Sequence, residues 1–151
     1  MQPQPPKNSM SSTIISLDVG ERRIGVAIAR LDIRFPSPLA TVERGDDSPA
    51  QIKQLLDEHD ASALVIGLPR SLQGDETAQT QAVKAFAQTL NGVITVPVYW
   101  MDEAVTSHKA EQELIARGKP YKKGDIDALS AVYILEDFLR DHPEDGRENK
   151  A

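Results

Sequence analysis

IISLDVGERRIGVAIA, residues 14–29, is the segment on which the predicted architecture rests. Two apolar runs rich in β-branched residues flank Gly20 and a short charged turn, a pattern typical of a β-hairpin. The first run is apolar at nearly consecutive positions, so we expect a central strand that is buried on both faces. It ends in a single carboxylate, Asp18, whose charge is costly to bury without a cation or a donor as partner.

Beyond the hairpin, helical and strand patterns alternate. A third strand is predicted at Leu39–Glu43, at a sheet edge because prolines precede and enter it. Ser48 as N-cap and Pro49 at the first helical position predict a helix that runs to about His59. The continuous apolar run Ser62–Leu68 predicts a buried parallel strand, and a helix followed by such a strand is typical of an α/β fold.

The second half of the chain continues this alternation and then ends in two helices. Apolar residues at helical spacing, with glycine or basic residues at the ends, mark the helices. The predicted elements are a helix at Ala78–Leu90, a strand at Val96–Met101, a helix capped by Thr106 or Ser107 that ends at Arg117, and a helix from Ile126 to about Arg140 capped by Asp125.

The bulk composition is that of one ordinary globular domain. The chain has 151 residues, of which 40% are hydrophobic and 26% charged, and its net charge is −6. We expect a disordered polar lead at 1–11, a folded domain at 12–140 and a disordered charged tail at 141–151. The absence of cysteine excludes disulfides, thiolate metal sites and a cysteine nucleophile.

No targeting or membrane segment is evident in the sequence. Residues 1–12 are polar and proline-rich and lack the apolar core of a signal peptide. No apolar run approaches the roughly 20 residues that span a bilayer. We therefore expect a cytoplasmic protein without membrane association, and nothing in the pattern indicates an oligomeric state.

Three acids from distant parts of the chain are candidates for one site. Asp18 and Glu103 stand at the carboxyl ends of predicted buried strands, the edge at which open α/β sheets bind ligands. Asp127 lies in the first turn of the last predicted helix, on its small apolar face. Three converging carboxylates would raise one another's pKa, and a pair of Mg²⁺ or Mn²⁺ ions would neutralise them. Such a pair can hydrolyse a phosphodiester.

Each acid also has a simpler explanation, and composition and spacing do not choose between them. Asp18 could end a strand and cap a turn, and Glu103 could be an ordinary loop acid. Asp127 would favour the macrodipole at a helix N-terminus without any metal. Asp125, two residues earlier, is the better candidate for the N-cap.

Basic residues gather in the turns and loops predicted near the same strand ends. They could form a rim that contacts phosphates on an otherwise acidic protein, or they could be solvated loop charges. These residues are Arg22, Arg23, Arg70, Lys119, Lys122 and Lys123.

Four segments, taken together, resemble the YqgF family, also called RuvX. They are LDVGERRIGVAIA (17–29), VIGLPRSLQGDETAQT (65–80), WMDEAVTSHKAEQEL (100–114) and KKGDIDALSAVYILEDFL (122–139). Each motif is weak by itself, but all four occur in the family's order and spacing from about residue 13 to 140. The family consists of Holliday-junction-resolvase-like proteins that are named as nucleases of precursor 16S ribosomal RNA.

The resemblance implies a ribonuclease-H-like α/β fold with a central mixed sheet, an N-terminal antiparallel hairpin and edge strand, and helices on both faces. It also implies metal-dependent hydrolysis of nucleic-acid phosphodiesters. By position, the family's catalytic and metal-binding acids fall on Asp18, Glu103 and Asp127, with Asp18 shared by the two ions. The implied substrate is the 5′ end of precursor small-subunit ribosomal RNA, with branched DNA as an alternative.

One departure from the family pattern bears on activity. The family's arginine after Asp-Glu is Ala104 here, which cannot contact phosphate or orient the glutamate. A non-catalytic nucleic-acid or ribosome-assembly module is therefore a competing hypothesis. A phosphotransferase of the actin or sugar-kinase type is a third, although such enzymes need two domains of this kind and the chain holds one.

Overall fold

The computed structural model describes residues 12–103 and 107–142. Its elements follow the predicted order, with a hairpin and an edge strand first and two helices last. They are β1 (Thr13–Val19), β2 (Arg23–Arg30), β3 (Ser37–Glu43), α1 (Ser48–Glu58), β4 (Ala63–Pro69), α2 (Ala78–Thr89), β5 (Val98–Glu103), α3 (Ser107–Arg117) and α4 (Lys123–Asp141).

The five strands form one mixed sheet in the order β3-β2-β1-β4-β5. The pairs β1–β2 and β2–β3 are antiparallel, whereas β4 runs parallel to both β1 and β5. β1 lies at the centre and β3 at an edge, as predicted from its apolar run and from the prolines. The predicted α/β class, with a central mixed sheet, an N-terminal antiparallel hairpin and an edge strand, is confirmed.

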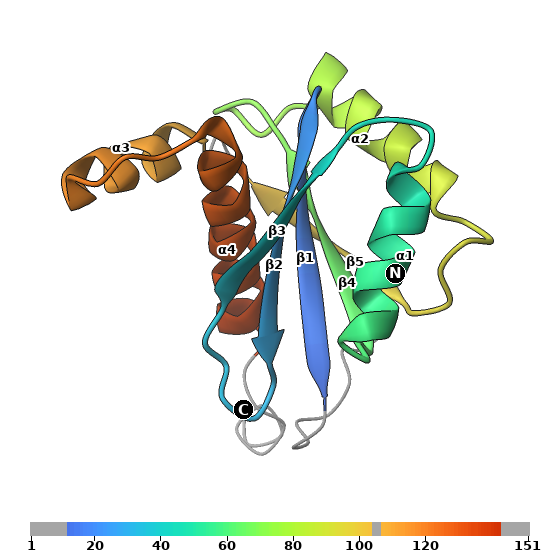
Figure 1. Ribbon diagram of the computed structural model, residues 1–151. Coiled ribbons are helices and arrows are strands. Elements are labelled where there is room, and N and C mark those ends of the chain that lie inside the picture. The colour runs from blue at the N-terminus through green and yellow to red at the C-terminus, as the bar shows by residue number, and fades with distance from the viewer. Residues whose placement is uncertain (1–11, 104–106, 143–151) are drawn as a thin grey trace.

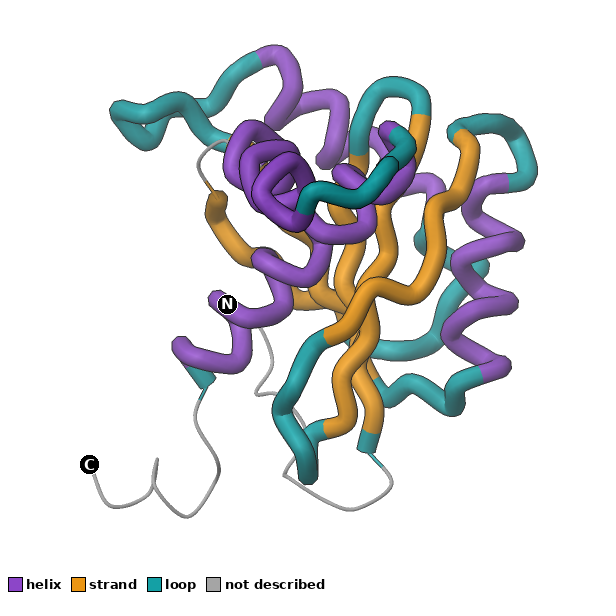
Figure 2. Tube along the Cα trace, turned by 60° about the vertical axis from the view of Figure 1, so that its left-hand side comes forward, coloured by secondary structure: helices purple, strands orange, loops and turns teal. Residues whose placement is uncertain are grey.

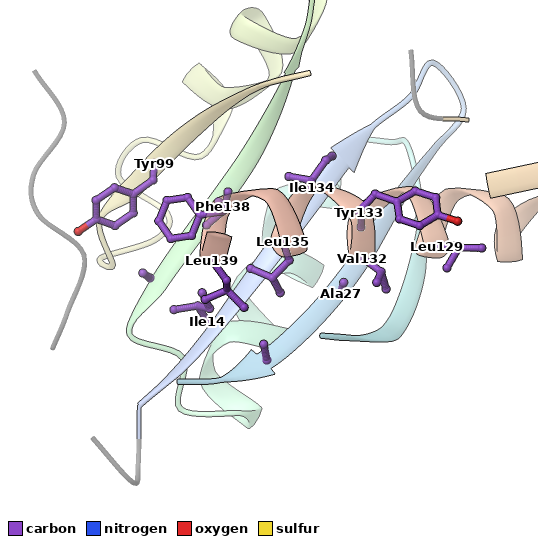
Figure 3. Packing of buried hydrophobic residues seen from close by; sticks show 14 of the residues in the cluster. Ile14, Ala27, Tyr99, Leu129, Val132, Tyr133, Ile134, Leu135, Phe138 and Leu139 are labelled. Carbon is purple, nitrogen blue, oxygen red and sulfur yellow. The ribbon is translucent and has the colours of Figure 1, made fainter. Parts of the chain in front are cut away.

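Helices cover both faces of the sheet, as expected. Figures 1 and 2 show α4 against one face and α1 and α2 against the other, while α3 extends sideways from the start of α4. Each face has its own apolar cluster, one built on α4 and the other on α1 and α2. Figure 3 shows the first of these, in which Tyr99 of β5 lies beside Phe138 of α4. Within the described ranges, no helix is long and apolar enough to cross a membrane.

α4 lies unusually close to the strands beneath it. A Cβ atom added at Gly25 would lie 1.8 Å from the carbonyl oxygen of Asp127, so α4 begins in direct backbone contact with β2. Farther along, a Cβ at Gly67 would lie 2.3 Å from the Ile134 side chain. Between them the buried Ser16 hydroxyl of β1 donates to the Ala131 carbonyl at 2.7 Å. α4 therefore crosses the sheet diagonally, from β2 over β1 and β4 towards β5.

Two predicted helix starts were wrong. The N-cap of α1 is Asp47 rather than Ser48, because the buried Ser48 hydroxyl accepts from Gly45 N–H and donates to the Glu43 carbonyl. α4 begins at Lys123, with Lys122 as N-cap. Asp125 is the third helical residue, and its carboxylate accepts from the Lys122 N–H at 2.9 Å.

The ends of the predicted domain remain a prediction. α4 continues to Asp141, the first residue of the predicted charged tail. The predicted disordered lead at 1–11 and residues 143–151 of the tail lie outside the described residues.

Candidate metal-binding and nucleic-acid site

Asp18 lies near the carboxyl end of β1, opposite Gly25 in the β1–β2 ladder. Its side chain shares a face with Ser16, which contacts α4, so it also points towards that helix. The residue keeps some exposure, but its carboxyl group is surrounded by protein. Burial, and next the negative charge of Asp127, raise the pKa of Asp18 from 3.8 to about 7. A carboxyl group held in this way is half protonated near neutral pH.

Asp127 comes from the second turn of α4 and lies directly over Gly25. Because Gly25 pairs with Asp18, the two carboxylates are neighbours across the junction of sheet and helix. Arg23, the first residue of β2, donates through Nε to Asp127 Oδ2 at 2.7 Å. Asp127 and Arg23 are both partly buried, with 21% and 26% of their side chains exposed. The site therefore combines two carboxylates with one guanidinium.

The Ser130 hydroxyl completes this corner of the site. It is fully buried and lies close enough to Asp18 to donate a hydrogen bond to that carboxylate, which partly offsets the rise in the pKa of Asp18. A buried hydroxyl beside two carboxylates is a further oxygen that a cation or a water molecule could engage.

Glu103 lies elsewhere, although it ends β5 on the α4 face of the sheet as expected. Burial and then a hydrogen bond to Asp137, together with the charge of Asp137, raise the pKa of Glu103 to about 8. Arg140 opposes this rise and forms an ion pair with Asp137 at 2.8 Å. The Oε1 atom of Glu103 is buried without a hydrogen-bond partner among the described residues.

The structure therefore brings together Asp18 and Asp127 but not all three predicted acids. Among the side chains that the structure describes, residues 12–103 and 110–142, no three from His, Cys, Asp or Glu form a group that could hold a metal ion. The reason is the path of α4. β5 is two strands from β1, roughly 10 Å away. Residues 127 and 137 are about 15 Å apart along the helix and lie over different strands.

The predicted basic residues lie along one edge of the molecule. Arg22 is in the β1–β2 turn, and Arg70 directly follows β4. Lys122 and Lys123 stand at the start of α4, where the Thr41 hydroxyl of β3 donates to the Gly124 carbonyl. Figure 1 shows the carboxyl ends of β1 and β4 and the start of α4 at the same end of the molecule, at the top. Contact with nucleic acid by any of them remains a prediction.

Two of these basic residues are engaged by acids within the protein. Arg23 binds Asp127, as described above. Arg70 lies 3.3 Å from Asp102 and 3.5 Å from Glu76, and its backbone N–H donates to the Glu103 carbonyl at 2.9 Å. Arg70 therefore secures the loop after β4 to the end of β5.

Sequence reasoning missed Asp137 and Arg140, the partners at Glu103. Only the helical pattern of the last segment was visible, and it does not reveal which strand a given turn crosses. The sequence indicates Ser130 only as part of the small apolar face of the last helix. Ala104, where the family pattern has arginine, lies outside the described residues.

Comparison with known proteins identifies relatives of nearly the whole chain. A family model described as "RuvX: Holliday junction resolvase" matches residues 12–141. A protein of Chloroflexus aurantiacus is 44% identical over 130 residues, which cover 83% of this chain and 85% of that protein. One from Streptomyces avermitilis is 43% identical over 139 residues, covering 88% of each. Both are named "Putative pre-16S rRNA nuclease".

Solved structures of similar shape are more distant. Thermus thermophilus RuvC in complex with a Holliday junction substrate is 16% identical, with a TM-score of 0.49 over 85% of this chain and 95% of that one. The Fowlpox virus resolvase with Holliday junction DNA is 10% identical, also with a TM-score of 0.49, over 84% of this chain and 99% of that one.

Proposed function

This chain belongs to the RuvX family, and from that premise we propose that it is a metal-dependent nuclease that hydrolyses phosphodiester bonds in precursor 16S ribosomal RNA. The observation that carries the proposal is that the carboxylates of Asp18 and Asp127 lie close together at the carboxyl end of the central strand. A nuclease of precursor ribosomal RNA would work in the cytoplasm, and this location is part of the proposal.

The residues at this corner suit a hard divalent cation. Asp18 and Asp127 repel each other when both are charged, and the buried Ser130 hydroxyl lies beside Asp18. Mg²⁺ and Mn²⁺ prefer oxygen ligands of this kind. When bound, such ions supply Lewis acidity that activates a water molecule and stabilises the leaving oxygen. Asp18 and Asp127 would hold the first ion.

A second ion is the further part of this proposal. Asp18 would be shared between the two ions, and Glu103 would complete the second site. Glu103 stands on the correct face, and one of its oxygens is buried without a partner among the described residues. To take part, its side chain must leave Asp137 and lose its proton. The chain's basic edge, formed by Arg22, Arg23, Arg70, Lys122 and Lys123, would hold the phosphate backbone of the RNA.

The test is cleavage of a precursor 16S RNA fragment in Mn²⁺ and in EDTA. Asp18→Asn and Asp127→Asn are expected to lose cleavage by at least about a hundredfold, because each replaces a charged carboxylate ligand with a neutral amide that binds the cation more weakly. The matched control is Asp125→Asn, two residues earlier on α4, whose amide oxygen can still accept from Lys122 N–H. It is expected to retain activity.

Three outcomes distinguish the alternatives. Full activity of Asp18→Asn would overturn the site. RNA binding that persists in EDTA, without cleavage in any metal, would favour a non-catalytic binding module. A four-way DNA junction, tested in parallel, shows whether branched DNA is the better substrate, as the family's description suggests.

A further inference from the structure

Arg23 and Asp127 face each other across the junction of β2 and α4. Arg23 lies two residues before Gly25 on β2, so its side chain shares the face on which Gly25 touches the backbone of Asp127. The register that pairs Gly25 with Asp18 fixes the two strands, and Thr41 of β3 donates to the Gly124 carbonyl at 2.9 Å. The 2.7 Å bond from Arg23 Nε to Asp127 Oδ2 therefore joins two well-anchored elements.

The guanidinium of Arg23 meets the same electrostatic need that a divalent cation would. Asp127 stands close enough to Asp18 to raise that residue's pKa, so without a positive charge the two carboxylates would push the start of α4 away from the sheet. Arg23 supplies that charge. Its own pKa is raised by the hydrogen bond to Asp127 and by that residue's charge, so it stays protonated throughout the ordinary pH range.

A divalent cation bound to Asp127 would have to compete with Arg23. The carboxylate oxygen that accepts from Nε is partly neutralised by that bond and is a weaker ligand for metal. Once a cation neutralises Asp127, the guanidinium loses its main attraction but keeps its charge and its place at the edge. Its planar fork of donors matches the two free oxygens of a phosphodiester.

We propose that Arg23 is a positioning residue that holds Asp127 in the metal-free protein and exchanges that carboxylate for a phosphate of the RNA when a divalent cation binds between Asp18 and Asp127. The inference rests on the proposed function, because it requires the metal site and a nucleic-acid substrate. It adds an order of events, in which metal binding frees the cation that the RNA then engages. A permanent structural ion pair is the alternative.

The first measurement is Mn²⁺ affinity of metal-free, RNA-free protein, from the electron paramagnetic resonance signal of free Mn²⁺. Arg23→Gln is expected to bind Mn²⁺ about tenfold more tightly than the unaltered chain, a change of about 1.4 kcal/mol. The matched control is Arg22→Gln, the exposed neighbour, which is expected to stay within about twofold. Circular dichroism checks that each variant is folded.

A double-mutant cycle assigns the effect to the right carboxylate. In an Asp127→Asn background the competition is absent, so adding Arg23→Gln is expected to leave Mn²⁺ affinity unchanged. Arg23→Lys keeps the charge but cannot reproduce the planar fork, and we expect an intermediate gain. If Arg23→Gln tightened Mn²⁺ binding as much in the Asp127→Asn background as in the unaltered chain, the exchange would be overturned.

The second measurement is RNA affinity by fluorescence anisotropy, in EDTA and in Ca²⁺, with gels to check that the RNA stays intact. The unaltered protein is expected to bind RNA more tightly in Ca²⁺, and Arg23→Gln to lose most of that enhancement. Arg22→Gln is expected to weaken binding by the same factor in both buffers. An enhancement that survives in Arg23→Gln would overturn the proposal.

The results separate this inference from the proposed function. If the unaltered chain and Arg22→Gln bind Mn²⁺ and Arg23→Gln binds no more tightly, the exchange fails while the metal site stands. If none of the three proteins binds Mn²⁺, the metal site fails and the exchange fails with it.

Discussion

At the scale of single residues, Asp18 is held where its ionised form destabilises the folded chain. Its pKa is about 7 in the folded protein, against 3.8 when exposed. Between these values the folded state keeps a proton that the unfolded state has released, so the free energy of unfolding falls as pH rises. Keeping a carboxylate in such a place is typical of a functional site.

The isosteric variant Asp18→Asn is therefore expected to be more stable than the unaltered protein at neutral pH. The gain should be small near pH 4 and grow through pH 7, to as much as about 4 kcal/mol for a shift of about three pKa units. Urea denaturation in EDTA at several pH values measures it. Asp46→Asn, in an exposed loop, is the control and should change stability by less than about 0.5 kcal/mol. A pH-independent effect of Asp18→Asn would contradict the assigned cause.

Glu103 and Asp18 together predict the pH dependence of cleavage. Carboxylates bind metal in the deprotonated form, so the rate is expected to rise with pH through about 7 to 8. Asp137→Asn removes the negative charge that helps to raise the pKa of Glu103, so the upper part of the rise should move to lower pH. Asp141→Asn, a weaker contributor, should move it less. An identical profile for Asp137→Asn and the unaltered enzyme would exclude Glu103 from the site.

At the scale of elements, α4 determines which acids meet. Its first turns lie over β2 and β1, where Asp127 joins Asp18, and its last turns lie over β5, where Asp137 joins Glu103. Two glycines beneath α4 permit this close crossing, and Figure 3 shows how the helix side chains fill the space above the strands.

The two glycines are expected to respond differently to alanine. At Gly25 the new Cβ would meet backbone atoms of Asp127 and Ala128, which cannot move without shifting α4. At Gly67 it would meet the flexible Ile134 side chain. Gly25→Ala should therefore destabilise the protein by about 3 kcal/mol or more, and Gly67→Ala by about 1 to 2 kcal/mol. Thermal unfolding of both variants measures the difference, and equal losses would mean that α4 adjusts as easily at its start as in its middle.

At the scale of the whole molecule, a net charge of −6 must be reconciled with the proposed nucleic-acid substrate. The basic residues at one edge provide a local attraction, and the acidic remainder discourages binding elsewhere. Arg70 contributes least to such attraction, because Asp102 and Glu76 neutralise it.

The salt dependence of RNA binding should therefore reveal a small, local set of phosphate contacts. Lys123→Ala is expected to weaken binding and to reduce the slope of log K against log salt by about 1. Lys53→Ala, on α1 and paired with Asp57, should leave the slope unchanged. Anisotropy titrations in EDTA between about 50 and 200 mM salt measure it. Equal effects of the two variants on the slope would mean that RNA does not bind at the basic edge of the protein.

The elements of this fold were predictable because their signals are local. The hairpin is specified by neighbouring residues, namely the apolar run before Asp18, the glycine and the charged turn. The helices and the parallel strand at Ala63–Pro69 are likewise specified by residues that are close in sequence. The predicted starts of two helices were less accurate. The Ser48 hydroxyl donates to the Glu43 carbonyl in a buried turn instead of capping α1, and Asp125 caps α4 from the third helical position rather than from the N-cap position.

The local pattern also located Asp18 and Glu103 at strand ends and Asp127 on a helix face. It did not reveal that Arg23 would hold Asp127 or that Glu103 would lie beside Asp137. The two residues of the first pair are 104 positions apart in the sequence, and those of the second are 34 apart. They depend on the angle at which one helix crosses the sheet, and close packing at Gly25, Gly67 and Ser16 sets that angle only when the whole chain is folded.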